Sequence, residues 1–117
     1  MAKSILADKT LAFAIRVVNC VKYLQSEKSE FVISKQMLRS GTSVGANLHE
    51  VLYAQSKADF ASKLSISLKE ASETSYWLTL LRETDYLDPS IYESLKMDID
   101  EIIRMIIASL KTIKKDE

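Results

Sequence analysis

Residues 36–50 of the chain read QMLRSGTSVGANLHE and contain both of its glycines, Gly41 and Gly45. Each glycine inside a helix costs about 1 kcal/mol relative to alanine. Either a helix breaks here, or another backbone packs very close to it. Polar and small side chains keep a spacing of three and four residues straight through the stretch, which favours a continuous helix with a close neighbour.

Outward from this stretch, apolar side chains recur every three or four residues along the chain. The pattern predicts helices over residues 2–27, 31–55, 57–84 and 89–115. Ser56, with Asp59 three residues later, predicts the start of the third helix, and Asp88 followed by Pro89 predicts the start of the fourth. Helices of about twenty or more residues joined by short loops predict one all-α domain, an antiparallel up-down-up-down four-helix bundle over residues 1–117.

The composition excludes several other classes of protein. A chain of 117 residues with 2 Gly and 1 Pro lacks the turn residues of β-sandwiches and the glycine-rich loops of nucleotide-binding folds. Apolar residues make up 47% and charged residues 27%, which is typical of a folded domain. No apolar stretch reaches the roughly 18 residues of a membrane span, and the single cysteine, Cys20, cannot form an intramolecular disulfide. We therefore expect a cytoplasmic protein without membrane contact.

The first and fourth predicted helices carry more apolar side chains than a bundle core needs. Each helix of a monomeric bundle presents roughly three apolar positions in seven to the core. The first helix has a second apolar stripe at Leu11, Ile15 and Val18, and Ile103 and Ile107 widen the face of the fourth. The extra side chains either pack under loops and helix ends or contact another chain. Wide apolar faces rarely stay exposed on a small bundle, so we expect self-association.

Three carboxylates, Glu50, Glu70 and Glu73, are the strongest candidates for chemistry. Di-iron sites in helical bundles use Glu-x-x-His motifs, but Glu73 stands where the histidine would be, and His49 points about 100° away from Glu50. A carboxylate–metal enzyme is therefore the least favoured hypothesis, and we expect ion pairs and hydrogen bonds instead. The polar network predicted between the second and third helices comprises Gln36, Arg39, Ser43, Asn47, Glu50, Glu70, Glu73 and Thr74.

The sequence contains no complete set of catalytic residues. His49 is the single histidine and has no correctly spaced acid, and Cys20 and the serines lack the local motifs of nucleophilic catalysis. We expect no catalytic residue, no cofactor and no metal site, and thus no enzyme. Aromatic side chains such as Tyr76 and Trp77 are expected in the core or an interface, since no basic stripe accompanies them for nucleic-acid binding.

Charge is balanced over the whole chain but not along it. The 16 basic and 16 acidic residues give a net charge of zero, whereas the amino-terminal half carries more basic than acidic residues. This surplus could form a basic face, with candidate nucleic-acid contacts at Lys3, Lys9, Arg16, Lys22, Lys28 and Lys35. The other interpretation is that these charges are balanced by neighbouring helices or subunits.

Residues 34–81 resemble the four-helix bundle family of the 23S rRNA intervening-sequence proteins. The matching features on the second helix are Gln36, Arg39-Ser40, Ser43-Val44, Ala46-Asn47 and Glu50. Those on the third helix are Asp59-Phe60, Lys63-Leu64, Lys69-Glu70, Glu73-Thr74 and Trp77-Leu78. The flanking helices fit the length and order of the family, so the resemblance covers essentially the whole chain.

The resemblance implies a non-enzymatic, homo-oligomeric bundle, typically a ring of five copies, that acts as a scaffold or binds a partner. It also implies that the shared polar residues lock the second helix against the third, with Gly41, Gly45 and Ala46 permitting close approach. A related group, the accessory variability proteins of diversity-generating retroelements, binds nucleic acid through a strongly basic ring. Binding of RNA or DNA is therefore the alternative function, although a net charge of zero departs from that group.

Overall fold

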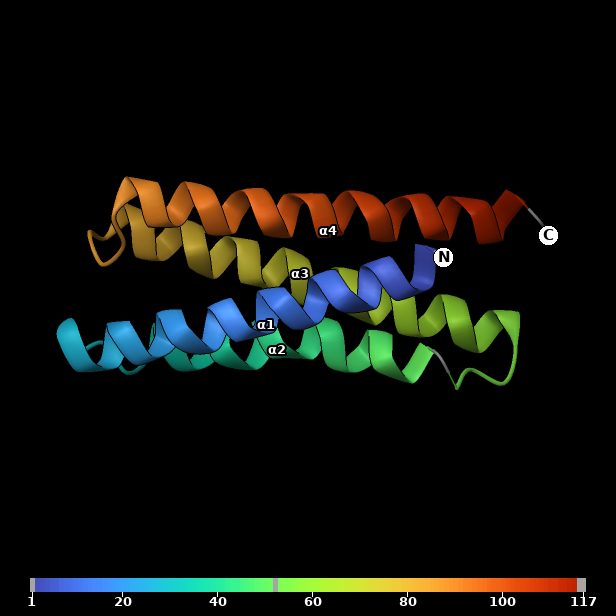
Figure 1. Cartoon of the computed structure of the whole chain (residues 1–117), viewed down its shortest axis with the longest axis horizontal. Coiled ribbons are helices and arrows are strands. Elements are labelled where there is room, and N and C mark those ends of the chain that lie inside the picture. The colour runs from blue at the N-terminus through green and yellow to red at the C-terminus, as the bar shows by residue number, and fades with distance from the viewer. Residues whose placement is uncertain (1, 52, 116–117) are drawn as a thin grey trace.

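Four helices account for nearly all of the computed structural model, which describes residues 2–51 and 53–115. They are α1 (Ala2–Glu27), α2 (Ile33–Val51), α3 (Lys57–Glu83) and α4 (Pro89–Lys115). Successive helices run in opposite directions and lie side by side in an elongated bundle of 48 × 21 × 20 Å (Figure 1). No strand occurs in the described ranges, so the predicted all-α four-helix bundle is confirmed.

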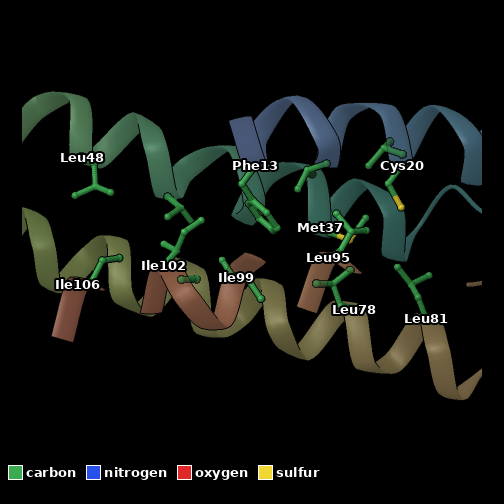
Figure 2. Packing of buried hydrophobic residues seen from close by; sticks show 14 of the residues in the cluster. Phe13, Cys20, Met37, Leu48, Leu78, Leu81, Leu95, Ile99, Ile102 and Ile106 are labelled. Atoms are coloured by element: carbon green, nitrogen blue, oxygen red, sulfur yellow. The ribbon is translucent and has the colours of Figure 1, made fainter. Parts of the chain in front are cut away.

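The helices form a closed four-cornered arrangement. α1 packs against α2 and α4, and α3 packs against the same two helices, so that α1 and α3 are diagonal to each other. Side chains from all four helices meet along the bundle axis (Figure 2). Phe13, Met37, Leu78 and Ile99 are at most 1% exposed, and they place one continuous apolar core between the helices.

The predicted second helix, 31–55, is shorter in the structure, which places α2 at Ile33–Val51. At its end, hydrogen bonds from Tyr53 N to Glu50 O and from Ala54 N to Val51 O close tight turns instead of continuing the helix. The predicted third helix, 57–84, ends one residue earlier because Thr84 is its C-cap. The first and fourth helices span 2–27 and 89–115 as expected.

Both predicted helix starts are present. The Ser56 side chain accepts a hydrogen bond from Asp59 N at 3.1 Å, which makes Ser56 the N-cap of α3. The Asp59 carboxylate in turn accepts from Gln55 N at 3.2 Å, as in a capping box displaced by one residue. Pro89 is the first residue of α4, where its missing N–H leaves no hydrogen bond unmade.

Glu30 determines where α2 begins, and sequence patterns did not reveal this role. Its carboxylate accepts hydrogen bonds from three successive backbone N–H groups, those of Val32 at 3.1 Å, Ile33 at 2.9 Å and Ser34 at 2.6 Å. The Ser34 hydroxyl donates back to the Glu30 carbonyl at 2.9 Å. Glu30 is only 7% exposed, so its side chain is largely shielded from water. The negative carboxylate also suits the positive end of the helix dipole.

Replacement of Glu30 by alanine is expected to lower the free energy of unfolding by about 1–2 kcal/mol at neutral pH. Burial alone would raise the pKa of Glu30, but hydrogen bonds led by Ile33 N outweigh it and hold that pKa below its ordinary value of 4.5. The ionised cap therefore stabilises the fold fully above the unfolded-state pKa and loses this effect as pH falls through the folded-state pKa. Urea unfolding followed by circular dichroism at several pH values measures both effects.

Glu27→Ala is the matched control, because Glu27 lies in the same segment and is exposed. It should leave both the stability and its acid dependence nearly unchanged. A Glu30→Ala protein whose stability matched that of the Glu27→Ala protein at neutral pH would contradict the capping role.

Two helix ends use residues other than glycine in the left-handed region of backbone conformation. Ser29, with φ of 53°, follows α1, and Asp85, with φ of 67°, follows α3. In both places the chain reverses through hydrogen bonds back to one carbonyl of the last turn, that of Leu24 or of Leu81. Glycine is the usual residue at such a position because it has no Cβ.

Replacement of Ser29 by glycine is therefore expected to raise the free energy of unfolding by roughly 0.5 kcal/mol. The gain is small because glycine also makes the unfolded chain more flexible. Asp85→Gly should give less, since aspartate tolerates this conformation better than serine. Thermal unfolding of both variants measures the difference, and a lower stability of the Ser29→Gly protein would show that the serine side chain has a role of its own.

Candidate interaction surfaces

Ion pairs at the surface join α2 to α3. The Arg39 guanidinium donates to the Glu70 carboxylate at 3.0 Å and also to that of Glu73. The Trp77 indole N–H donates to Glu73 at 3.0 Å. This Trp77 hydrogen bond, followed by the contact with Arg39, holds the pKa of Glu73 below its ordinary value. The structure thus brings together Arg39, Glu70 and Glu73, which sequence reasoning placed in one network.

Beneath these ion pairs, buried hydroxyl groups connect the same two helices. Thr74 Oγ1 lies 2.8 Å from Ser40 Oγ and 2.8 Å from the Glu70 carbonyl oxygen. The Ser67 hydroxyl donates to the Val44 carbonyl at 2.6 Å. Ser40, Ser67 and Thr74 are completely buried. Sequence reasoning missed the roles of Ser40 and Ser67, although Ser67 falls on the same helical stripe as Leu64 and Leu78, a position at which a hydroxyl needs a partner.

Three residues predicted for the network do not join it. The Ser43 hydroxyl donates to the Arg39 carbonyl at 2.6 Å, and the Asn47 amide donates to the Ser43 carbonyl at 2.8 Å. Both acceptors lie four residues earlier in α2, because short polar side chains on a helix reach their own backbone more easily than another helix. Gln36 is exposed and has no hydrogen bond from its side chain in the described ranges.

The third predicted carboxylate, Glu50, also lies apart from the network. It accepts a hydrogen bond from Lys63 Nζ at 3.1 Å, and this ion pair lies nearer the carboxyl end of α2 than the pairs of Glu70 and Glu73. No group of three His, Cys, Asp or Glu side chains within residues 2–51 and 53–115 is arranged to hold a metal ion. The three carboxylates therefore form two separate sets of ion pairs.

The glycines of α2 face α1, and the expectation that they permit close approach of α3 is wrong. A Cβ atom at Gly41 would lie 2.9 Å from both methyl groups of Val17, and one at Gly45 would lie 3.3 Å from Thr10. Ala46, the third small residue of the predicted contact, is exposed. Successive residues of a helix point about 100° apart. Ser40 faces α3, so Gly41, the next residue, faces a different helix. Close packing itself is confirmed.

Small side chains also leave a groove between α1 and α2 at the surface. Its volume is about 340 Å³, and its lining includes Ala7, Thr10, Leu11, Ala14, Gly45 and His49. His49 is exposed and packs edge-on against the ring of Tyr53, with 5.7 Å between ring centroids. The groove is mostly apolar, and its outer edge continues onto the exposed side of α1.

We call the exposed stripe Leu11, Ile15 and Val18 the α1 outer face. Leu11 is 63% exposed and Ile15 55% exposed, while Val18 is half-buried. The expectation of apolar surface left over by the core therefore holds for α1. On α4 it holds only weakly, because Ile103 packs against the core and Ile107 is 37% exposed.

The candidate nucleic-acid contacts divide into paired and unpaired cations. Lys9 donates to Glu101 at 2.8 Å, and Arg16 forms an ion pair with Asp98. The hydrogen bond from Lys9 holds the pKa of Glu101 below its ordinary value. Both pairs join α1 to α4. These two basic side chains are thus balanced by acids of a neighbouring helix, which was the second interpretation of the charge distribution.

The remaining candidates are lysines. Lys22, Lys28 and Lys35 are exposed and form no ion pair within the described ranges. They lie on the last part of α1, the following loop and the first turn of α2, at one end of the bundle (Figure 1). The side chain of Lys3 lies outside the described part of the structure. Among the described helices, none has an apolar segment long enough to cross a membrane.

Comparisons with known proteins agree with this architecture. The sequence model of the family described as 23S rRNA-intervening sequence protein matches residues 2–108. A crystal structure of a protein with unknown function, from the S23 ribosomal protein family of Bacteroides thetaiotaomicron, is similar with 52% sequence identity and a TM-score of 0.93. The similarity covers 95% of this chain and 99% of that one. Among curated proteins, none matches the chain.

Proposed function

Because the chain belongs to the family of 23S rRNA-intervening sequence proteins, we propose that it is a non-enzymatic bundle that assembles into a ring of five copies and serves as a scaffold or partner-binding module. The α1 outer face is the observation that carries this proposal. Leu11 and Ile15 lie one turn apart on one side of α1, next to the apolar groove, and both are more than half exposed. Full burial of such a side chain contributes about 1.5–3 kcal/mol, so a second chain that covered this face would bind favourably.

The non-enzymatic role is supported by the state of the acidic side chains. Glu70 and Glu73 share Arg39, and Glu50 is paired with Lys63. A general acid or base needs a carboxyl group poised near the working pH, and the contacts of Glu73 move its pKa downward, away from neutrality. Glu73 is therefore suited to hold helices together and not to transfer protons.

Light scattering coupled to size-exclusion chromatography tests the proposal. At micromolar concentration, the assembly should have five times the mass of the 13.2 kDa chain. The mass should stay constant across the eluting peak, since a closed ring has a fixed number of copies. A mass of 13.2 kDa at the highest concentration tested would refute self-association.

Binding of RNA or DNA is the alternative function, and the three unpaired lysines at one end of the bundle favour it. Because Lys9 and Arg16 are already paired, most of the contacts would come from Lys22, Lys28 and Lys35. Three phosphate contacts on a single strand give a slope of log affinity against log salt of about −2.

Fluorescence anisotropy with mixed-sequence RNA at low ionic strength tests this alternative. Binding with that slope, lost when the three lysines are replaced by glutamine, would support it. If no salt-sensitive binding occurs at low ionic strength, nucleic acid is not the partner. Replacement of Lys111 and Lys114 by glutamine is a suitable control, because these exposed lysines lie at the opposite end of the bundle.

A further inference from the structure

Two neighbouring apolar side chains are exposed on the turn between α1 and α2. Phe31 is 57% exposed and Val32 is 75% exposed. Both lie at one end of the bundle, beyond the α1 outer face that the proposed assembly would cover (Figure 1). Exposed apolar side chains are common on soluble proteins, so the meaning of this pair depends on the groups around it.

Hydrogen bonds fix the backbone on both sides of Phe31. After it, three successive N–H groups donate to the Glu30 carboxylate at 2.6–3.1 Å. Before it, the N–H groups of Lys28 and Glu30 donate to the Leu24 carbonyl at 3.1 and 3.0 Å. A surface that is already ordered loses little conformational freedom when a ligand binds. The turn therefore holds Phe31 in place for a ligand.

Two exposed lysines lie side by side next to this turn, one on each helix. Val17 of α1 contacts Gly41 of α2, so these two residues share a level along the bundle. Lys22 lies about 7.5 Å from Val17 toward the turn, and Lys35 lies about 9 Å from Gly41 in the same direction. The two lysines are therefore level to within about 2 Å, with Phe31 beyond both of them.

Lys28 adds a third cation within the turn itself. We call Lys22, Lys28, Phe31, Val32 and Lys35 the α1–α2 corner. All three lysines are exposed, and none of them forms an ion pair within residues 2–51 and 53–115. The corner thus combines three free positive charges with an exposed aromatic ring.

The acidic side chains at this end of the bundle point away from the corner. Glu27 is five residues from Lys22, so the two point about 140° apart around α1. The Glu30 carboxylate is directed at the N–H groups that it caps. The exposed acids at the end of α3 and the start of α4 lie on the other side of the bundle end (Figure 1): Glu83, Asp85, Asp88 and Glu93. Exposed positive charge at this end is therefore concentrated at the α1–α2 corner.

Free lysines beside an exposed aromatic ring are suited to a single strand of nucleic acid. Lysines bind the phosphates, and the aromatic ring stacks on a base, whatever the identity of that base. In an intact duplex the bases are already stacked on each other, so the ring has no free base to contact. The Phe31 ring therefore favours single strands over duplexes.

We propose that the α1–α2 corner binds single-stranded nucleic acid, with Phe31 stacked on one base and the three lysines on neighbouring phosphates. Val32 extends the apolar surface beside the ring. This inference rests on the alternative function proposed above and names the form of nucleic acid and the residue that contacts its bases.

Fluorescence anisotropy with labelled single strands of RNA and of DNA, each of mixed sequence and about 12 nucleotides, tests the proposal. Phe31→Leu keeps an apolar side chain but removes the ring, and it should weaken binding about tenfold at every salt concentration. The slope of log affinity against log salt should stay at about −2, because no phosphate contact is lost. Phe31→Tyr keeps the ring and should retain nearly the native affinity.

Tyr53→Leu is the matched control. Tyr53 is 73% exposed and lies beyond α2 at the opposite end of the bundle, so its substitution should leave the affinity unchanged. A duplex of the same sequence should bind more weakly than the single strand, and Phe31→Leu should not weaken that binding further. Far-ultraviolet circular dichroism should show the native helix content in every variant, since both aromatic side chains lie outside the core.

The outcomes separate this site from nucleic-acid binding in general. Binding that requires the three lysines but is equally tight for the native chain and Phe31→Leu would overturn the stacking while the alternative function stands. The absence of salt-sensitive binding to both strands would overturn both proposals. Phe31-dependent binding to vesicles of phosphatidylserine and phosphatidylcholine, without binding to either strand, would overturn the site in favour of a membrane surface. Binding of only one strand supports the site and identifies that nucleic acid as its ligand.

Discussion

Replacement of Leu11 and Ile15 together by glutamate is expected to convert the assembly into monomers of 13.2 kDa without loss of helix. Both side chains are more than half exposed in the isolated bundle, so the fold does not depend on their burial. In the assembly, each new carboxylate would have to leave water without a partner, which costs several kcal/mol per group. Light scattering measures the mass, and far-ultraviolet circular dichroism measures the helix content.

Met97→Glu is the control for this prediction. Met97 is 70% exposed on α4 and lies outside the α1 outer face, so its substitution should change neither mass nor helix content. If the protein with both α1 substitutions kept the full mass of the assembly, the α1 outer face would not be the contact. Loss of helix in that protein would contradict the placement of these side chains outside the core.

Replacement of Gly41 by alanine is expected to lower the free energy of unfolding, even though alanine favours helix. The new Cβ would lie 2.9 Å from both methyl groups of Val17, which is fully buried. Valine in a helix is held in one rotamer, so α1 and α2 must move apart. Overpacking typically costs about 1–3 kcal/mol, against a gain of about 1 kcal/mol in helix propensity. Urea unfolding should therefore show a net loss of up to about 2 kcal/mol.

Gly45→Ala provides the matched comparison, with the same gain in helix propensity. Its Cβ would lie 3.3 Å from Thr10, a tight contact that a small adjustment relieves. We expect the stability of this variant to stay close to that of the native chain. Equal stabilities of the two alanine variants would contradict the account of Gly41 as the closest point between α1 and α2.

The sequence was sufficient to predict the four helices and several of the residues at which they begin or end. Periodic apolar residues depend only on the local chain, and so do the caps at Ser56 and Pro89. The cap formed by Glu30 was not predictable in this way. Glutamate is not a usual N-cap residue, and its role depends on a turn that brings three N–H groups to one carboxylate.

Side-chain length explains which parts of the predicted network form. Arg39 is long enough to cross from α2 to α3, so its partners Glu70 and Glu73 were predictable from helix faces alone. Ser43 and Asn47 are short and bond to carbonyl groups of their own helix. Residue spacing cannot distinguish these outcomes, because they depend on the distance between helices.

The sequence also could not predict which helix each helix face contacts. Helical periodicity groups residues onto faces, but it does not tell which helix a face meets. Gly41 was therefore expected to lie against α3, whereas it lies against α1. Similarly, the ion pairs of Lys9 and Arg16 with α4 could be stated only as one of two interpretations of the charge distribution.

Native mass spectrometry of the unmodified chain tests self-association, the central claim, most directly, because it counts the copies in each assembly. We expect one species with five times the mass of the 13.2 kDa chain, and few smaller species at micromolar concentration. A spectrum that contains only the 13.2 kDa chain under these conditions would contradict the account.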